Sequence, residues 1–384
     1  MEPGSTASRL TARKRRAVGL IAISVLALAT AGLSWIAPGL HLGESSTSKT
    51  AAVYPTMYDF ATVSVGWAVV ARPIETTVLK TLDGGKHWRL QNRLGGSYSA
   101  TIQFVDTTRG FVVTGNPNRL YRTTDGGTHW TLAVMPLDRT YGITFSDARH
   151  GSSSVPATFV NVRTADGGDT WLRLPDAPKD SYGPVFRGTE AWLGAYATPL
   201  GRVHVYNSFD GGLAWSSVEV PVPPAFKPKS SGPQFFTAQV RLMPGAGVAV
   251  LLSVGTECQK NTPCVRPDEV QFQSFDNGGT WKGLPPPPAE FGFGDIAYQD
   301  SVHWWAIGRG LVFKSSDAGY TWQQIAPMAP AAGQFALHVV DAQHAWAQNS
   351  MFMTQEGGGF QLSAVVVTND GGLSWTRVPQ PQLP

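Results

Sequence analysis

Cysteine is scarce in this chain, and its two copies lie close together. The 384 residues contain only Cys258 and Cys264, six positions apart in a stretch that also holds proline. This spacing is a poor match to a zinc site, because no histidine or second cysteine pair lies nearby. Two interpretations remain open: a small disulfide, which an oxidising compartment would permit, or a pair of free thiols in an exposed insertion.

Charged residues are also few, at 15% of the chain, and their distribution excludes one class of partner. The formal net charge is +3, but residues 1–40 contribute +4, so the remaining residues sum to about −1. A nearly neutral body offers no bulk attraction to nucleic acid. We therefore expect no nucleic-acid partner.

Sequence signatures of common enzyme chemistry are missing as well. The chain has no Ser-His-Asp motif, no glycine-rich phosphate loop and no histidine spacing typical of a metal site. The sequence therefore predicts no catalytic residue, no cofactor-binding residue and no metal ligand. Glycine (42) and proline (28) are abundant instead, which is typical of many short strands joined by turns.

One long apolar run is present, and it lies near the N-terminus. Residues 13–16 are all basic and precede an uncharged segment, 17–40, whose apolar part from Ala17 to Ala37 has 21 residues. At about 1.5 Å per residue, this length matches the ~30 Å core of a bilayer. The basic residues before it predict a cytoplasmic N-terminus, with the rest of the chain outside.

Two fates of this segment are consistent with an exported body. A signal anchor would stay in the cell membrane as a single pass, whereas a signal peptide would be cut near residue 31 and the protein secreted. The apolar run continues through Leu33 and Ile36, which favours the anchor. We predict a cytoplasmic basic tail (1–16), a transmembrane signal anchor (17–40), a flexible linker (41–52) and a folded body (53–384).

Seven copies of one short pattern run through the folded body. Each copy, here called a box, has the form Ser/Thr-x-Asp-x-Gly-x-x-Trp. The box aspartates are Asp83, Asp125, Asp166, Asp210, Asp276, Asp317 and Asp370. The box tryptophans are Trp88, Trp130, Trp171, Trp215, Trp281, Trp322 and Trp375. So strict a repeat indicates units that stack on their neighbours.

The spacing of the boxes predicts the architecture. Successive box aspartates lie 41 to 66 residues apart, and about 40–50 residues suit a four-stranded propeller blade. In the second copy we predict strands at 101–106, 110–114, 119–124 and 129–133, with Asp-Gly-Gly as the last hairpin turn. The sequence therefore predicts an all-β, seven-bladed β-propeller preceded by one transmembrane helix.

A structural role explains every box position. The carboxylate would accept hydrogen bonds from its own turn, the glycine permits a positive φ, and the tryptophan covers the hairpin. Seven carboxylates, one in each blade, would not converge on one site. We therefore interpret the boxes as structural.

The boxes resemble the Asp-box repeats, also called BNR repeats, of sialidases and sortilin-type receptors. The stretch that contains Phe104, Asp106, Gly110-Phe111 and the box around Asp125 is most similar to propellers of the photosystem II stability/assembly-factor type. This resemblance covers about residues 53–384. It implies a seven-bladed propeller that binds a partner protein without doing chemistry, and the photosynthetic role of part of that group is not carried over.

A sialidase-like or other glycan-acting hydrolase is the alternative. A sialidase would have an Arg-Ile-Pro motif before its first box, whereas this chain has Arg72-Pro73-Ile74 there. The paired carboxyl groups of a glycosidase also have no candidate. Asp106, Asp147 and Asp341 lie before second strands and are interpreted as turn residues.

Differences among the blades suggest where a partner would bind. Three residues before the box aspartate, four copies carry a basic side chain: Lys80, Arg122, Arg163 and Lys314. These residues would form a patch for an acidic peptide, glycan or lipid headgroup, or merely an ordinary solvated strand face. The stretches 221–233, 256–267 and 349–361 are predicted to be long loops, used for binding or tolerated as surface decoration.

Together these features predict a binding or assembly scaffold at the outer face of a cytoplasmic membrane. Its partner would be a protein or a glycan, and its membrane contact would be the N-terminal helix. We expect the chain to act as a monomer.

Overall fold

A computed structural model describes most of the folded body. The described residues are 54, 56–96, 99–136, 141–155, 160–175, 177–178, 181–197, 203–222, 234–256, 268–285, 288, 295–308, 310–327, 335–355 and 358–381. The chain divides into Met1–Ala51 and Ala52–Pro384, and every described residue belongs to the second part. The predicted tail, anchor and linker, and the pair Cys258 and Cys264, lie outside the described residues. Within those residues, no helix has the length and apolar character to cross a membrane.

The first half of the body forms four groups of four successive strands, here called repeats 1 to 4. Repeat 1 comprises β1 (Thr56–Phe60), β2 (Gly66–Ala71), β3 (Glu75–Thr81) and β4 (Arg89–Gly95). Repeat 2 comprises β5 (Ala100–Phe104), β6 (Gly110–Thr114), β7 (Arg119–Thr123) and β8 (Thr131–Ala133). Repeat 3 comprises β9 (Tyr141–Phe145), β10 (Gly151–Val155), β11 (Val160–Thr164) and β12 (Leu172–Arg173). Repeat 4 comprises β13 (Ser181–Arg187), β14 (Glu190–Ala197), β15 (Val203–Ser208) and β16 (Ser216–Val220).

Three further repeats complete the body. Repeat 5 comprises β17 (Gln234–Leu242), β18 (Val248–Thr256), β19 (Asp268–Ser274) and β20 (Lys282–Leu284). Repeat 6 comprises β21 (Asp295–Tyr298), β22 (Trp304–Gly308), β23 (Leu311–Ser315) and β24 (Gln323–Pro327). Repeat 7 comprises β25 (Phe335–Val339), β26 (Ala345–Gln355), β27 (Gly358–Thr368) and β28 (Thr376–Arg377). Repeats 4 and 5 share one eight-stranded sheet because β14 pairs with β17, and each of the other repeats forms its own four-stranded sheet.

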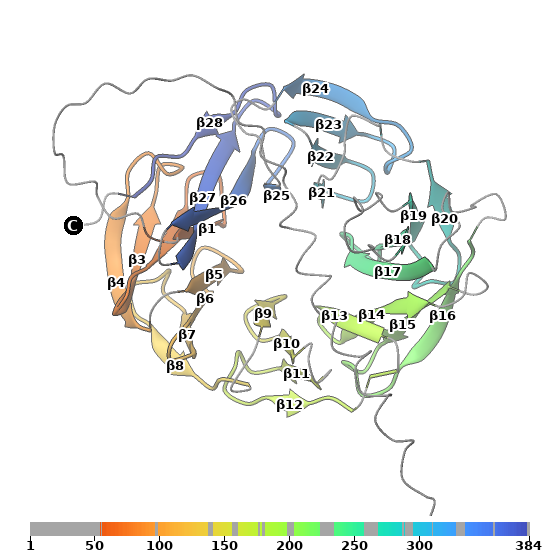
Figure 1. Cartoon of the computed structure of the whole chain (residues 1–384), viewed down its shortest axis with the longest axis horizontal. Helices are drawn as coiled ribbons and strands as arrows, with labels where there is room; N and C mark the ends of the chain where they lie inside the picture. The colour runs from red at the N-terminus through yellow and green to blue at the C-terminus, as the bar shows by residue number, and fades with distance from the viewer. Residues whose placement is uncertain are drawn as a thin grey trace, which may run out of the picture. The chain divides into compact units, whose positions relative to one another are not determined.

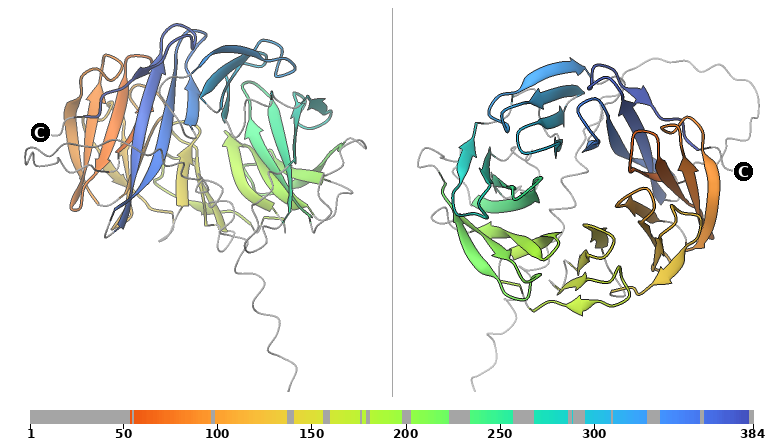
Figure 2. Two further views of the ribbon diagram at one scale, coloured as in Figure 1. Left: turned by 45° about the horizontal axis from the view of Figure 1, so that its top comes forward. Right: turned by 180° about the vertical axis from the view of Figure 1, so that it is seen from behind.

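The repeats stand around a common centre in chain order (Figures 1 and 2). The first strand of each repeat lies nearest this centre, and the fourth strand lies outermost (Figure 1). Within the described residues every regular element is a strand. Sheets arranged radially in this way form a β-propeller, which confirms the predicted all-β propeller class.

The apolar core lies between neighbouring repeats. Every residue of β2 is buried, and its Trp67 joins a cluster with Phe104 and Val112 of repeat 2. Trp346 and Phe60 belong to the cluster that connects repeat 7 back to repeat 1. Fully burying a large apolar side chain stabilises a fold by about 1.5–3 kcal/mol, so each joint between repeats contributes substantially.

Hydrogen bonds explain the spacing within each box. In repeat 2, the Thr123 hydroxyl donates to Asp125 Oδ1 (2.9 Å) and accepts the N–H of Gly127 (3.0 Å). The same carboxylate oxygen accepts the N–H of His129 (2.9 Å), while Gly127 adopts a φ of 90°. The hydroxyl-to-carboxylate bond recurs in the other six boxes. Each box therefore satisfies the polar groups of its own hairpin.

A further box position is absent from the sequence pattern. The residue four places after the aspartate contacts the second carboxylate oxygen in six boxes, through an imidazole or a hydroxyl. These residues are His87, His129, Thr170, Thr280, Thr321 and Ser374. The fourth box has Ala214 at this position. Because imidazole and hydroxyl groups perform the same task there, a pattern of identical residues does not reveal it.

The predicted strands of repeat 2 agree with β5 to β8 to within about two residues at each end. The predicted loop at 349–361 is wrong. There β26 and β27 continue as a paired hairpin as far as Gln355 and Gly358. The additional residues of this repeat therefore lengthen two strands.

Candidate binding site

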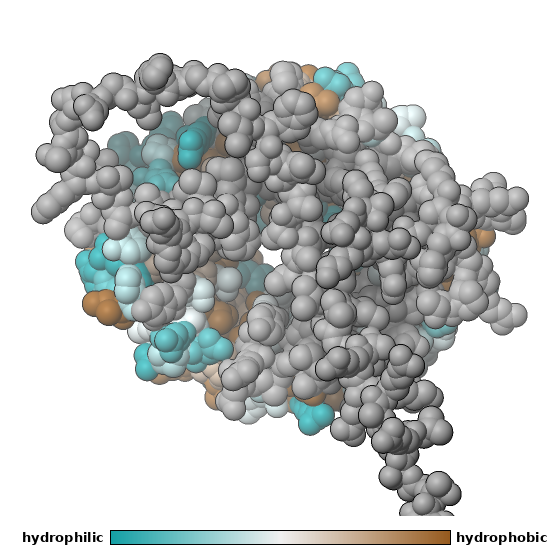
Figure 3. Space-filling model, in the orientation of Figure 1, coloured by the Kyte–Doolittle hydropathy of each residue, from teal (hydrophilic) through white to brown (hydrophobic). Residues whose placement is uncertain are grey.

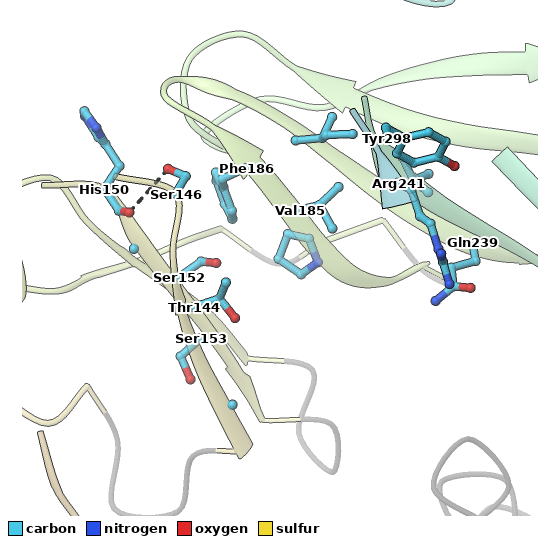
Figure 4. Close-up of a pocket in the computed structure, with 15 residues that line it drawn as sticks. Thr144, Ser146, His150, Ser152, Ser153, Val185, Phe186, Gln239, Arg241 and Tyr298 are labelled. Carbon is cyan, nitrogen blue, oxygen red and sulfur yellow. Dashed lines mark hydrogen bonds between the residues drawn. The ribbon is translucent and has the colours of Figure 1, made fainter. Parts of the chain in front are cut away.

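A cavity of about 560 Å³ lies on the inner side of repeats 3 to 6. Its walls come from β9, β10, β13, β17 and β21, and four of these are the first strands of their repeats (Figure 4). The lining includes the side chains of Thr144, Ser152, Phe186, Gln239, Arg241 and Tyr298. A space of this size with a few polar groups suits a small molecule or part of a peptide.

The cavity is close to electrically neutral. None of the described lining residues is Asp or Glu, and the guanidinium of Arg241 lies 3.0 Å from the Asp295 carboxylate. Burial raises the pKa of Tyr298 to about 12, although the Arg241 charge acts in the opposite direction. The phenol therefore keeps its proton at neutral pH. Within the described ranges, no three His, Cys, Asp or Glu side chains converge as metal ligands would.

The coloured part of the face that Figure 3 shows carries no large hydrophobic patch. On the coloured part of that face, hydrophobic side chains are scattered among hydrophilic ones (Figure 3). Single exposed apolar residues are normal on a soluble protein. The cavity is therefore the better candidate for a binding site.

The second strand of repeat 3 differs from its counterparts beside this cavity. Trp67, Phe111 and Trp192 each pair with the residue just before the box hydroxyl on the third strand, whereas in repeat 3 that place belongs to Ser152. The serine run from 152 to 154 is visible in the sequence. These serines indicate a cavity only when the strand on the other side of the joint is known. The sequence alone does not identify that strand, so it did not predict this site.

The two lysines of the predicted basic patch each reach the following repeat. Lys80 Nζ donates to the carbonyl oxygen of Gly126 (3.0 Å), and Lys314 Nζ donates to that of Ala342 (3.1 Å). Each ammonium group also lies over a tryptophan ring, 5.0 Å and 3.6 Å from the respective centroids. Burial lowers the pKa of both lysines. Both side chains thus already have partners within the protein.

The two arginines of the predicted patch lie at similar joints. Arg122 pairs with Asp169 (2.7 Å) in the box turn of repeat 3. The Arg163 guanidinium packs so closely against Gly211 in the next box that a Cβ there would collide with it. These contacts show how the cations link adjacent repeats. A shared ligand for the four residues remains a prediction.

The box carboxylates are held in their ionised form. The pKa is lowered to about 2 in Asp125, Asp166, Asp276 and Asp370, and it is also lowered in Asp83, Asp210 and Asp317. The largest cause is a hydrogen bond from the residue four places later, except in Asp210, where it is the Ser208 hydroxyl. Hydrogen bonds to an ionised carboxylate favour that form.

We expect acid to weaken the propeller through these carboxylates. A carboxyl group whose folded pKa lies below its unfolded value of about 3.9 stabilises the fold above that pH. This contribution is lost as the pH falls through the folded pKa. The free energy of unfolding should therefore decrease between about pH 4 and about pH 2, as measured by urea denaturation of the full chain.

An Asp125→Asn variant serves as the control for this pH dependence. The amide has no charge to lose, so the decrease between about pH 4 and about pH 2 should be shallower than in the parent. Equal slopes for the two proteins would contradict the role given to this carboxylate.

Comparisons with known proteins agree with the observed fold. No protein-family model matches the chain, and no curated protein matches it either. The solved structure of YCF48 bound to D1 peptide has a TM-score of 0.51 and 16% identity, covering 87% of this chain and 99% of that chain. YCF48 from Cyanidioschyzon merolae has a TM-score of 0.47 and 15% identity, covering 77% of this chain and 92% of that chain.

A GH74 enzyme is also among the similar structures. An ancestral GH74 enzyme has a TM-score of 0.46 and 13% identity, covering 85% of this chain and 56% of that chain. One propeller fold supports many activities, so the activity has to be argued from the site. Of these three structures, the peptide-bound YCF48 alone has a TM-score above 0.5, and that similarity supports the fold and nothing further.

Proposed function

We propose that this protein is a non-enzymatic binding scaffold that holds a segment of a partner protein in its central cavity. In this proposal repeats 1 to 7 are seven blades, and the boxes are Asp-box hairpins. Repeats 4 and 5 then count as two blades, joined by the additional pairing of β14 with β17. The boxes hold the blades in shape, and the cavity supplies the recognition.

The composition of the cavity carries this proposal. Its described lining combines hydroxyl groups, an amide and aromatic rings with almost no net charge. Such groups bind and orient a ligand, and they lack a pair of carboxyl groups for acid–base chemistry. The similar structure of YCF48 holds a D1 peptide, so a propeller of this general form accommodates a peptide.

A glycan-acting hydrolase has less support. Such an enzyme needs two carboxyl groups about 5–10 Å apart beside the bond it cleaves, and the described lining contains none. Burial raises the pKa of Asp59 to about 6, but this carboxylate accepts the N–H of Phe104 and is not part of the cavity lining. Its position therefore suits a link between repeats 1 and 2.

We further propose that the binding takes place outside the cytoplasmic membrane. The basic tail and the apolar segment 17–40 support this location, with residues 41–52 as the tether. A glycan partner and removal of the N-terminal segment are the alternatives. Protease added to intact cells should cut an exported propeller and spare a cytoplasmic one.

Selection of peptides on the purified full chain tests the proposed function. We expect selected peptides to bind with dissociation constants of roughly 1 μM to 1 mM, as measured by calorimetry. Gln239 is exposed and lines the cavity, so Gln239→Trp should block the space and weaken binding at least about tenfold.

Leu132→Trp is the matched control, because Leu132 is exposed on β8, outside the cavity lining. This variant should bind the selected peptides as the parent does. Peptides whose affinity is unchanged by Gln239→Trp would place the binding surface elsewhere, and a chain that binds no peptide would refute the proposal.

A further inference from the structure

Two joints of the propeller show how neighbouring repeats normally fit together. Trp67 of β2 stacks on Phe104 of repeat 2, with ring centroids 3.4 Å apart and planes inclined by 4°. Phe111 of β6 stacks on Phe145 of repeat 3 at 3.4 Å and 2°. In both cases an aromatic ring from a second strand covers the phenylalanine that ends the next repeat's first strand.

Other joints fill the same space with a large ring. Trp192 packs against repeat 5, Trp305 against repeat 7, and Trp346 lies 5.7 Å from the ring of Phe60 in repeat 1. Between repeats 5 and 6 the second strand offers only Ala249, and there Trp304 of repeat 6 packs against it. At each of these joints, one of the two neighbouring repeats thus supplies a bulky ring.

The joint between repeats 3 and 4 has no such ring among its described residues. Ser152 takes the place of Trp67 and Phe111, while Ala191 takes the place of Trp304. Phe186 is the counterpart of Phe104 and Phe145, since it pairs with Ala191 as they pair with Gly110 and Gly151. It is only half-buried, whereas Phe104 and Phe145 are 8% and 2% exposed.

A polar link is missing at the same joint. The Gln103 side chain accepts the N–H of Phe145 (2.9 Å) and donates to its carbonyl oxygen (2.8 Å). Thr144 has the place of Gln103 in repeat 3, and it is exposed. The backbone of Phe186 pairs with Ala191 of β14, and within the described residues no side chain of repeat 3 bonds to it.

We propose that the cavity takes up an aromatic side chain of a bound peptide, which stacks on Phe186 in the place of the missing ring. This inference rests on the proposed function and names the group that the site recognises. The other joints show that a planar ring fits this position. The neutral lining suits an uncharged ring, because the Arg241 charge is already paired with Asp295.

The backbone of the bound peptide would pair with strand β13 at the same joint. The strand β13 is the innermost strand of its repeat and pairs with β14, so its inner edge pairs with no described strand. A peptide that bonds to a strand edge gains affinity from its main chain and specificity from one side-chain pocket. Figure 4 shows Phe186 between the serine-bearing strand β10 and the side chain of Val185.

Substitution of Ser152 tests whether the joint between repeats 3 and 4 has space for another aromatic ring. In the full chain, Ser152→Phe should supply the missing ring and raise the thermal midpoint by about 2–4 °C. Ser216→Phe on β16 is the control, because Ser216 is exposed and should leave the midpoint unchanged. A lower midpoint for Ser152→Phe than for the control would overturn the inference.

Binding of peptide pools to the parent chain tests the preference for an aromatic side chain, and it does not depend on the folding of Ser152→Phe. Four pools of octapeptides carry Trp, Phe, Leu or Ala at the central position, with uncharged residues elsewhere, and calorimetry measures their binding to the full chain. The Trp and Phe pools should bind roughly tenfold more tightly than the Leu and Ala pools. The preference should disappear in Ser152→Phe.

The possible results separate the two claims. Equal binding of all four pools would refute the aromatic preference and leave the proposed function intact. Absence of binding by every pool would refute both. An aromatic preference that persists in Ser152→Phe would place the aromatic site elsewhere and overturn this inference.

Discussion

Replacing Trp67 with alanine should lower the free energy of unfolding by about 3–5 kcal/mol. The side chain is fully buried, stacks on Phe104 and donates its indole N–H to the carbonyl oxygen of Gly126 (2.9 Å). Alanine would leave a cavity between repeats 1 and 2 and remove that hydrogen bond. Urea denaturation of the full chain, followed by circular dichroism, measures the change.

Two further variants separate the causes of this loss. Trp67→Phe keeps a ring for stacking but removes the indole donor, so its cost should be smaller, at about 1–3 kcal/mol. Leu132→Ala changes a side chain that is 62% exposed and should alter stability by less than about 0.5 kcal/mol. If Trp67→Ala were as mild as Leu132→Ala, the joint between repeats would not be the core described above.

Gly319→Ala should be the second severe change, with an expected loss of about 2–5 kcal/mol. This box glycine has a φ of 84°, which L-residues adopt at a cost. A Cβ would also overlap the Trp304 ring, coming within 2.8 Å of Cε3. Both the backbone and the fully buried ring would have to move. Thermal and urea unfolding of the full chain measure the loss.

Gly245→Ala isolates the backbone contribution. Gly245 has a φ of 71°, and a Cβ at this position would meet no atom within 4 Å. Its substitution should therefore cost only about 1–2 kcal/mol, from the left-handed backbone alone. Equal losses at the two glycines would show that contact with Trp304 contributes nothing.

The residues that specify the fold lie close together in the sequence, whereas the residues that form the candidate site come from distant parts of the chain. A box spans eight residues, and the hydrogen bonds of its carboxylate join residues at most four positions apart. Seven such hairpins at regular spacing are sufficient to predict a β-propeller of four-stranded units. The residue four places after each aspartate escapes the pattern only because His87 and Thr170 perform the same task with different groups.

The basic residues beside the boxes show the limit of such local reasoning. In the sequence, Lys80, Arg122 and Arg163 recur at one box position and suggest a shared patch. In the structure, Lys80 and Arg122 bond to the box turn of the next repeat, and Arg163 packs against it. The partner of each cation lies some 45 positions further along the chain, so no local pattern identifies it.

The sequence by itself determined the hairpins and their number, because neighbouring residues decide these features. Only the tertiary structure decided that β14 pairs with β17 and that Ser152 and Phe186 line the same cavity. Both depend on which strands of different repeats meet. A serine in a strand indicates a candidate binding site only when the neighbouring repeat also has a small residue at the joint, as it does with Ala191 in the place of Trp304.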